Sequence, residues 1–154
     1  MKAIYFDMDG TIADLYGFEG WLDMLHAEDT TPYEMCEPCV DMIELAELLN
    51  EFIQLGIRIG VISWAAMGGS KQYGREVKKA KRRWCEQYLD CVSEFHVVKY
   101  GTPKHYVRKE KDSVLVDDDE KVRKAWKGET IDARENILEQ LRELLVRLEN
   151  ENDW

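Results

Sequence analysis

The sequence lacks an apolar run long enough to cross a membrane, and it contains few cysteines and prolines. No stretch reaches the roughly 18 consecutive apolar residues that a membrane-spanning helix requires. The opening Met-Lys-Ala-Ile-Tyr-Phe-Asp-Met-Asp-Gly places two acids where a secretory signal peptide has its apolar segment. We therefore expect a cytoplasmic protein that makes no contact with a membrane.

Four cysteines are too few for a disulfide scaffold, and a chain of 154 residues, 45% of them hydrophobic, can bury a core without one. Reduced thiols are the expected state. Cys36 and Cys39 have the spacing of a zinc knuckle, and Cys85 with Cys91 would supply two further ligands, although the gap between that second pair suits zinc poorly. Whether these two pairs bind a metal stays open at this point.

Basic residues are also scarce, with 21 Lys and Arg against 31 Asp and Glu and a net charge of −10. This balance disfavours a protein whose whole surface binds nucleic acid or anionic lipid. The exception is residues 71–83, which contain seven basic residues and one acid. A solvated helix face is the favoured interpretation, and a surface that binds the end of a nucleic acid is the alternative.

Short apolar runs alternate with helical patterns along the chain. The runs predict strands at residues 3–6, 57–62, 95–98 and 114–116, with a weaker one near Thr130 and Ile131. Helical spacing of apolar residues predicts helices at 40–55 and 75–89, one ending at Trp126, and one at 133–149. This alternation predicts a single α/β domain over residues 1–154, with a Rossmann-like parallel sheet of about five strands and helices on both faces.

Two further segments complete this prediction. Residues 14–39 are irregular, with one short helix expected near residues 21–26, and should form a small insertion after the first strand. The last predicted helix carries one apolar stripe, which should mostly cover the sheet. A homodimer through that stripe is possible, so the choice between monomer and homodimer stays open. The residues of the stripe are Ile137, Leu138, Leu141, Leu144, Leu145 and Leu148.

Polar residues stand where the predicted strands end, and parallel sheets bind ligands beyond these carboxyl ends. Asp7 follows the first strand, Ser63 the second and Asp117 the fourth. Asp7 and Asp9 are two positions apart, so in extended backbone they point to the same side. With Asp118, three or four carboxylates converge at one edge of the sheet and require a divalent ion, most simply Mg²⁺. The alternative is an Asp-Gly turn and a set of helix caps.

These motifs resemble, in their order, those of the haloacid dehalogenase superfamily. The first is Asp7-Met8-Asp9-Gly10-Thr11, followed by a strand ending in Ser63, then Lys104, then a strand ending in Asp117-Asp118. The resemblance implies a fold of that type and a Mg²⁺-dependent phosphomonoester hydrolase that works through an aspartyl-phosphate. In carrying an acid at Asp9, the chain resembles the phosphatases of this superfamily, whereas the dehalogenases of the superfamily lack an acid at this position.

The resemblance also implies a role for each motif residue. Asp7 would be the nucleophile, and Asp9 would protonate the leaving alcohol and later activate water. Thr11, which steadies the turn, belongs with Ser63 and Lys104 to the implied phosphate-binding residues. The implied Mg²⁺ ligands are Asp7, the backbone carbonyl of Asp9, Asp117 and Asp118.

The insertion is too short for a full helical cap, so the site should be open. The chain looks most similar to the small 5'-nucleotidase and deoxyribonucleotidase-like members of bacteria and phages, which implies a nucleotide substrate. Phe18, Trp21 and Trp64 are candidates for an aromatic wall against its base, although packing in the core is the favoured role for any one of them. The alternative functions are a 3'-phosphatase acting on nucleic acid ends and a non-catalytic protein that binds a phosphorylated metabolite.

Overall fold

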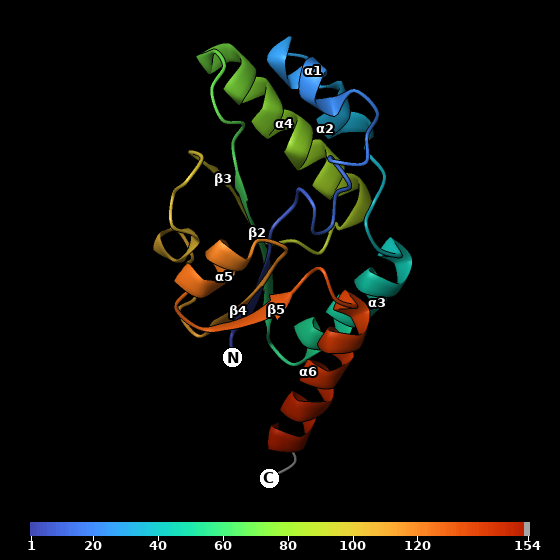
Figure 1. Ribbon diagram of the computed structural model, residues 1–154. Coiled ribbons are helices and arrows are strands. Elements are labelled where there is room, and N and C mark those ends of the chain that lie inside the picture. The colour runs from blue at the N-terminus through green and yellow to red at the C-terminus, as the bar shows by residue number, and fades with distance from the viewer. Residues whose placement is uncertain (153–154) are drawn as a thin grey trace.

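Five short strands form one parallel sheet in the computed structural model, which describes residues 1–152 (Figure 1). Their order in the sheet is β3-β2-β1-β4-β5, and every neighbouring pair is parallel. The strands are β1 (Ala3–Phe6), β2 (Arg58–Trp64), β3 (Glu94–Val98), β4 (Ser113–Asp117) and β5 (Glu129–Asp132). This arrangement confirms the predicted α/β class and the Rossmann-like parallel sheet.

The helices expected from the sequence pattern are all present in the expected order, with differences at their ends, and α2 is an additional one. They are α1 (Trp21–His26), α2 (Thr31–Met35), α3 (Met42–Gln54), α4 (Lys71–Tyr88), α5 (Glu120–Ala125) and α6 (Ile137–Asn152), together with a 3₁₀ turn at Lys104–Tyr106. Helix α4 begins four residues before the predicted start because the Ser70 side chain caps it by accepting from Tyr73 N. The sequence pattern does not predict helix α2, which lies in the irregular segment 14–39. Its Pro32 occupies the first turn, where proline suits a helix.

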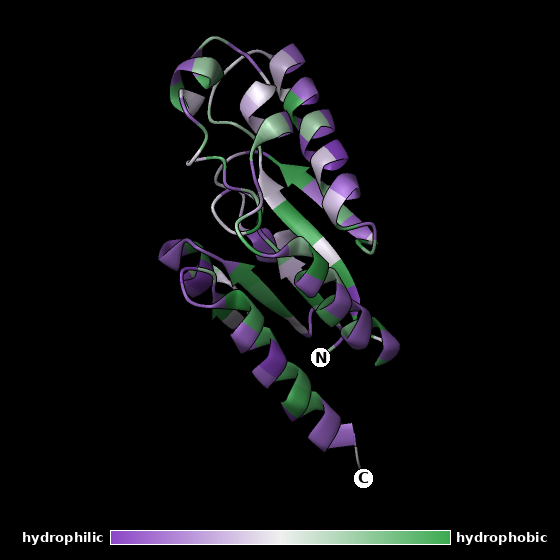
Figure 2. Ribbon diagram, turned by 90° about the vertical axis from the view of Figure 1, so that its right-hand side faces the viewer, coloured by the Kyte–Doolittle hydropathy of each residue, from purple (hydrophilic) through white to green (hydrophobic). Residues whose placement is uncertain are grey.

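Helices cover both faces of the sheet, as expected. Ile4 and Phe6 of β1 point toward the larger core, which α3 and α6 complete, whereas Tyr5 points to the opposite face and packs with Trp126 at the end of α5. Figure 2 shows strands that are mostly hydrophobic and an α6 on which hydrophobic and hydrophilic residues alternate. The apolar stripe of α6 is largely buried within the chain, so it is not the free dimerisation surface considered from the sequence.

The predicted insertion is present between β1 and α3, and it carries α1 and α2. In Figure 1 these two helices lie beside α4 at one end of the molecule. Tyr33 of α2 packs with Tyr73 and Val77 of α4 in a small separate core, which Leu15 joins. The insertion therefore rests on α4, above the carboxyl ends of the strands. Within residues 1–152, no helix combines the length and apolar character needed to cross a membrane.

Gly60 is a position where the fold allows no side chain. A Cβ there would lie 2.6 Å from the Tyr5 ring, and that ring cannot move away because its hydroxyl donates to Glu94 at 2.9 Å. We expect Gly60→Ala to lower the free energy of unfolding by about 1–3 kcal/mol. Gly74→Ala in α4 is the matched control, since a Cβ there meets nothing within 4 Å and should stabilise the helix by about 0.5–1 kcal/mol. Urea denaturation of both variants measures the difference, and equal midpoints would contradict the packing described here.

Candidate active site

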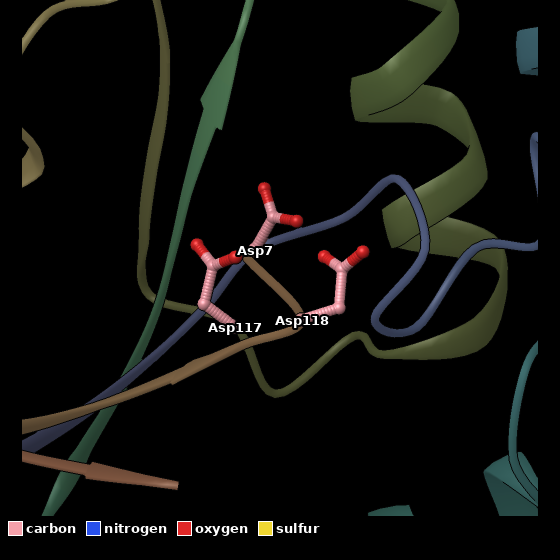
Figure 3. Close-up of side chains that lie close together, drawn as sticks. All are labelled: Asp7, Asp117 and Asp118. Atoms are coloured by element: carbon pink, nitrogen blue, oxygen red, sulfur yellow. The ribbon is translucent and has the colours of Figure 1, made fainter. Parts of the chain in front are cut away.

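Three carboxylates converge at the carboxyl edge of the sheet (Figure 3). Asp7 follows β1, Asp117 ends β4 and Asp118 follows it. Strands β1 and β4 are paired with Phe6 opposite Val116, so the residues after them come together. One oxygen of each carboxylate lies within 4.8 Å of the other two. The sequence correctly predicted this cluster.

Lys104 lies between two of these carboxylates. Its Nζ is 2.7 Å from Asp7 Oδ1 and 2.7 Å from Asp117 Oδ2, and its side chain is 2% exposed. Burial lowers the pKa of Lys104, but the carboxylates of Asp7 and Asp117 raise it by more, so the ammonium stays charged. Three carboxylates and one ammonium leave two uncompensated negative charges, the amount that a divalent cation neutralises.

Burial and the surplus of negative charge raise the pKa values of two carboxyls in the cluster. Burial, and then the neighbouring Asp7 carboxylate, raise the pKa of Asp117 to about 7. The same two causes raise the pKa of Asp118 to about 6. Carboxylates that resist ionisation until a cation arrives fit a site for a hard divalent ion, and the oxygen donors fit Mg²⁺.

The turn after β1 brings Asp118 close to the chain. Gly10 has a φ of +80°, and a Cβ on it would lie 2.5 Å from Asp118 Oδ2. The Thr11 hydroxyl lies 3.2 Å from Asp7 Oδ2 and 3.1 Å from Asp118 Oδ1, so its single O–H is shared between these two carboxylates. Thr11 is buried and does not line the cavity beside the cluster, so its phosphate-binding role stays a prediction, while its contacts tie the turn to Asp7 and Asp118.

Asp9 lines the same cavity as Asp7, as the two-residue spacing predicted, but it contacts a different lysine. Lys81 Nζ lies 2.8 Å from Asp9 Oδ2, 2.7 Å from Ser63 Oγ and 2.8 Å from the Trp64 carbonyl oxygen. The phosphate-binding role expected of Ser63 is not supported. Strand β2 continues to Trp64, which leaves Ser63 fully buried and away from the cavity wall.

Sequence reasoning missed Lys81, which it counted among the basic residues of 71–83. The helical spacing contains the signal that identifies it. Lys81 follows Val77 by four residues and precedes Trp84 by three, so it lies on the buried side of α4. The six other basic residues of that segment are exposed, as expected of a solvated face.

A cavity of about 660 Å³ opens beside the carboxylates. Trp21 and Trp64 line it, as predicted, but Phe18 packs against the main core instead. Sequence reasoning did not assign the four tyrosines that complete the aromatic lining: Tyr16, Tyr33, Tyr73 and Tyr100. Two aromatic pairs lie in this wall. Tyr16 is edge-on to Trp21 with 5.0 Å between ring centroids, and Trp64 is tilted against Tyr100 with 4.9 Å between ring centroids.

The cysteines form no comparable centre. All four are free thiols, and burial raises the pKa of each. Across residues 1–152, the carboxylate cluster is the one place where three or more possible metal ligands meet. A zinc site built from both cysteine pairs is therefore absent from the described part of the chain.

No protein-family model matches the chain, and no curated protein matches it.

Proposed function

We propose that this protein is a Mg²⁺-dependent phosphomonoester hydrolase whose nucleophile is Asp7. The observation that supports this most strongly is the buried cluster of Asp7, Asp117 and Asp118, with the Lys104 ammonium 2.7 Å from two of the three. Such a cluster is suited to hold one divalent ion and one phosphoryl group beside a carboxylate that attacks it.

Each residue then has a defined task. Thr11 and Lys104 hold both carboxylate oxygens of Asp7, which fixes its orientation for attack on phosphorus. Lys104 uses two of its three N–H groups on carboxylates, so the third can donate to a phosphoryl oxygen in the cavity that it lines. A Mg²⁺ ion bound to the three aspartates would neutralise the developing charge of the phosphoryl group. The backbone carbonyl of Asp9 as a further ligand stays a prediction.

Asp9 supplies the proton chemistry. As the bond between phosphorus and the leaving oxygen breaks, that oxygen takes the electron pair and a proton from the Asp9 carboxyl. Asp9 then removes a proton from the water that hydrolyses the aspartyl-phosphate. Burial raises the pKa of Asp9 although the Lys81 ammonium opposes this, and a raised pKa keeps the acid form accessible.

The cavity favours a monophosphate joined to a flat ring. Among the described residues that line it, Lys104 is the only lysine or arginine, which suits one phosphoryl group better than a chain of them. The aromatic pairs offer faces and edges against which a nucleobase can stack. The proposed substrate is therefore a nucleoside monophosphate.

Trp21 tests this substrate class, because it lines the cavity without touching the carboxylates. We expect Trp21→Ala to raise KM for a nucleoside 5'-monophosphate about 10-fold or more, since stacking on a base contributes about 1–3 kcal/mol. The KM for glycerol phosphate should not change. Tyr106→Ala is the control, because this tyrosine is 72% exposed and lies outside the cavity. An equal rise for both substrates in Trp21→Ala would contradict a base-stacking role.

Hydrolysis of 4-nitrophenyl phosphate with and without Mg²⁺ tests the activity itself. The proposal expects turnover that EDTA abolishes and added Mg²⁺ restores. Phosphate binding without any turnover would instead indicate a non-catalytic protein that binds a phosphorylated metabolite. A second panel of nucleoside monophosphates, sugar phosphates and 3'-phosphorylated oligonucleotides then ranks substrates by kcat/KM.

The same panel tests the alternative that the protein is a 3'-phosphatase acting on nucleic acid ends. The exposed basic face of α4 is the surface that would bind the nucleic acid. A 3'-phosphatase would prefer the oligonucleotide, and its affinity would fall with salt. Changing Lys78, Lys79 and Arg82 to Glu should then weaken binding. Lys81 must be left unchanged in this test, because it is buried in the site.

A further inference from the structure

Lys81 is a buried cation on the most basic helix of the chain. Its side chain is 1% exposed, and the ring of Tyr33 lies over its Nζ at 5.1 Å from the ring centroid. A buried charge is costly unless it is paired and hydrogen-bonded, so the position needs a specific reason. The contacts of the ammonium supply that reason.

The Lys81 ammonium has three N–H groups, and all three have partners. One donates to Asp9 Oδ2, one to Ser63 Oγ and one to the Trp64 carbonyl oxygen, each within 2.8 Å. No donor remains for a phosphoryl oxygen, and Lys81 does not line the cavity. Lys81 therefore differs from Lys104, which keeps one N–H group free.

The Asp9 carboxylate depends on this contact. Within residues 1–152, Lys81 is the only donor that its oxygens have. The bond is made to Oδ2, so Oδ1 carries no hydrogen bond. Two of the three Lys81 contacts are to the end of β2, a largely buried strand with a neighbour on each side in the sheet. Lys81 thus links a carboxylate on the turn after β1 to a rigid element.

We propose that Lys81 is a positioning residue that holds Asp9 with Oδ1 directed to the leaving group, and that Ser63 serves as its anchor. This rests on the proposed phosphatase function. The proton on Asp9 passes to the leaving oxygen while the bond from phosphorus to that oxygen breaks and its electron pair stays on the oxygen. A misplaced Asp9 would slow this transfer without preventing attack by Asp7.

The dependence of the rate on the leaving group tests this role. An unactivated alkyl phosphate needs protonation as its alcohol departs, whereas 4-nitrophenolate leaves without it. We therefore expect Lys81→Met to lower kcat/KM for the alkyl phosphate about 100-fold or more, the range that general acid catalysis contributes. The loss for 4-nitrophenyl phosphate should be smaller by about 10-fold or more, because its leaving group needs no proton. Lys78→Met, an exposed lysine on the same helix, should change neither value.

A double-mutant comparison separates an effect through Asp9 from a general loss of folded enzyme. The quantity compared is the ratio of kcat/KM for the alkyl phosphate to kcat/KM for 4-nitrophenyl phosphate. If Lys81 acts through Asp9, this ratio should be the same in Asp9→Asn and in the double variant that also carries Lys81→Met. If thermal unfolding shows that Lys81→Met does not fold, Lys81→Gln replaces it, because glutamine keeps N–H donors without the charge. For Lys81→Gln we expect a loss of kcat/KM for the alkyl phosphate that is smaller than the loss expected for Lys81→Met.

The outcomes separate the two proposals. An equal loss for both substrates in the Lys81 variant, or a further change of the ratio in the Asp9→Asn background, would overturn the positioning role while the phosphatase stands. Absence of turnover in the wild type would overturn the phosphatase proposal, and the role of Lys81 with it.

Discussion

Asp7→Asn should lower kcat for 4-nitrophenyl phosphate by at least about 10⁴-fold, because removal of a catalytic nucleophile costs losses of this order or larger. The amide keeps the shape of the side chain but cannot attack phosphorus. The variant should still fold, since it removes one negative charge from a cluster that carries two in excess. Thermal unfolding without Mg²⁺ should therefore show no loss of stability.

Two controls separate the nucleophile from the cluster around it. Asp23→Asn changes an exposed acid of α1 and should leave turnover unchanged. Asp118→Asn removes a predicted metal ligand and should raise the Mg²⁺ concentration needed for half-maximal rate. Activity of Asp7→Asn within a few fold of the wild type would exclude Asp7 as nucleophile.

Mg²⁺ should stabilise the folded protein, and more strongly at alkaline than at acidic pH. At a concentration 100 times its Kd, a ligand that binds only the folded state adds about 2.7 kcal/mol to the free energy of unfolding. For a chain of this size, that corresponds to a rise in Tm of about 5–10 °C. Metal binding competes with protons, because a carboxylate must be ionised to act as a ligand.

The direction of the pH dependence follows from the raised pKa values of Asp117 and Asp118, about 7 and about 6. An unfolded aspartate has a pKa of about 3.9, so folding takes up protons at both carboxyls between about pH 4 and pH 7. Through these two groups, the free energy of unfolding without metal falls as pH rises across that window. Mg²⁺ binding reverses this cost once the carboxyls are ionised.

Differential scanning fluorimetry at pH 8 and pH 5.5 measures the effect. The rise in Tm caused by Mg²⁺ should be several-fold larger at pH 8, and Asp117→Asn should remove most of it. Mg²⁺-induced rises that are equal at the two pH values, or that survive in Asp117→Asn, would show that the ion binds elsewhere.

The fold was largely predictable, because the spacing of hydrophobic residues along the chain indicates where its strands and most of its helices lie. Each predicted strand is present, and Asp7 and Asp117 come together because parallel strands end at one edge of a sheet. The pattern does not predict α2, because a proline such as Pro32 is common both in loops and in the first turn of a helix.

Residues that act through side-chain geometry were harder to assign. A motif places Ser63 near the site, but only the length of β2 shows that the serine is buried inside the sheet. Lys81 was hidden by the basic residues around it, although its spacing from Val77 and Trp84 marks the buried side of α4. The aromatic lining joins segments far apart in the chain, which no local pattern reveals.

The most direct test of the account is to stop turnover of a labelled phosphomonoester with acid and locate the phosphate by mass spectrometry. The account predicts an aspartyl-phosphate at Asp7 that forms only when Mg²⁺ is present and is absent from Asp7→Asn. Turnover with no phosphorylated Asp7, or with the phosphate on another residue, would contradict it.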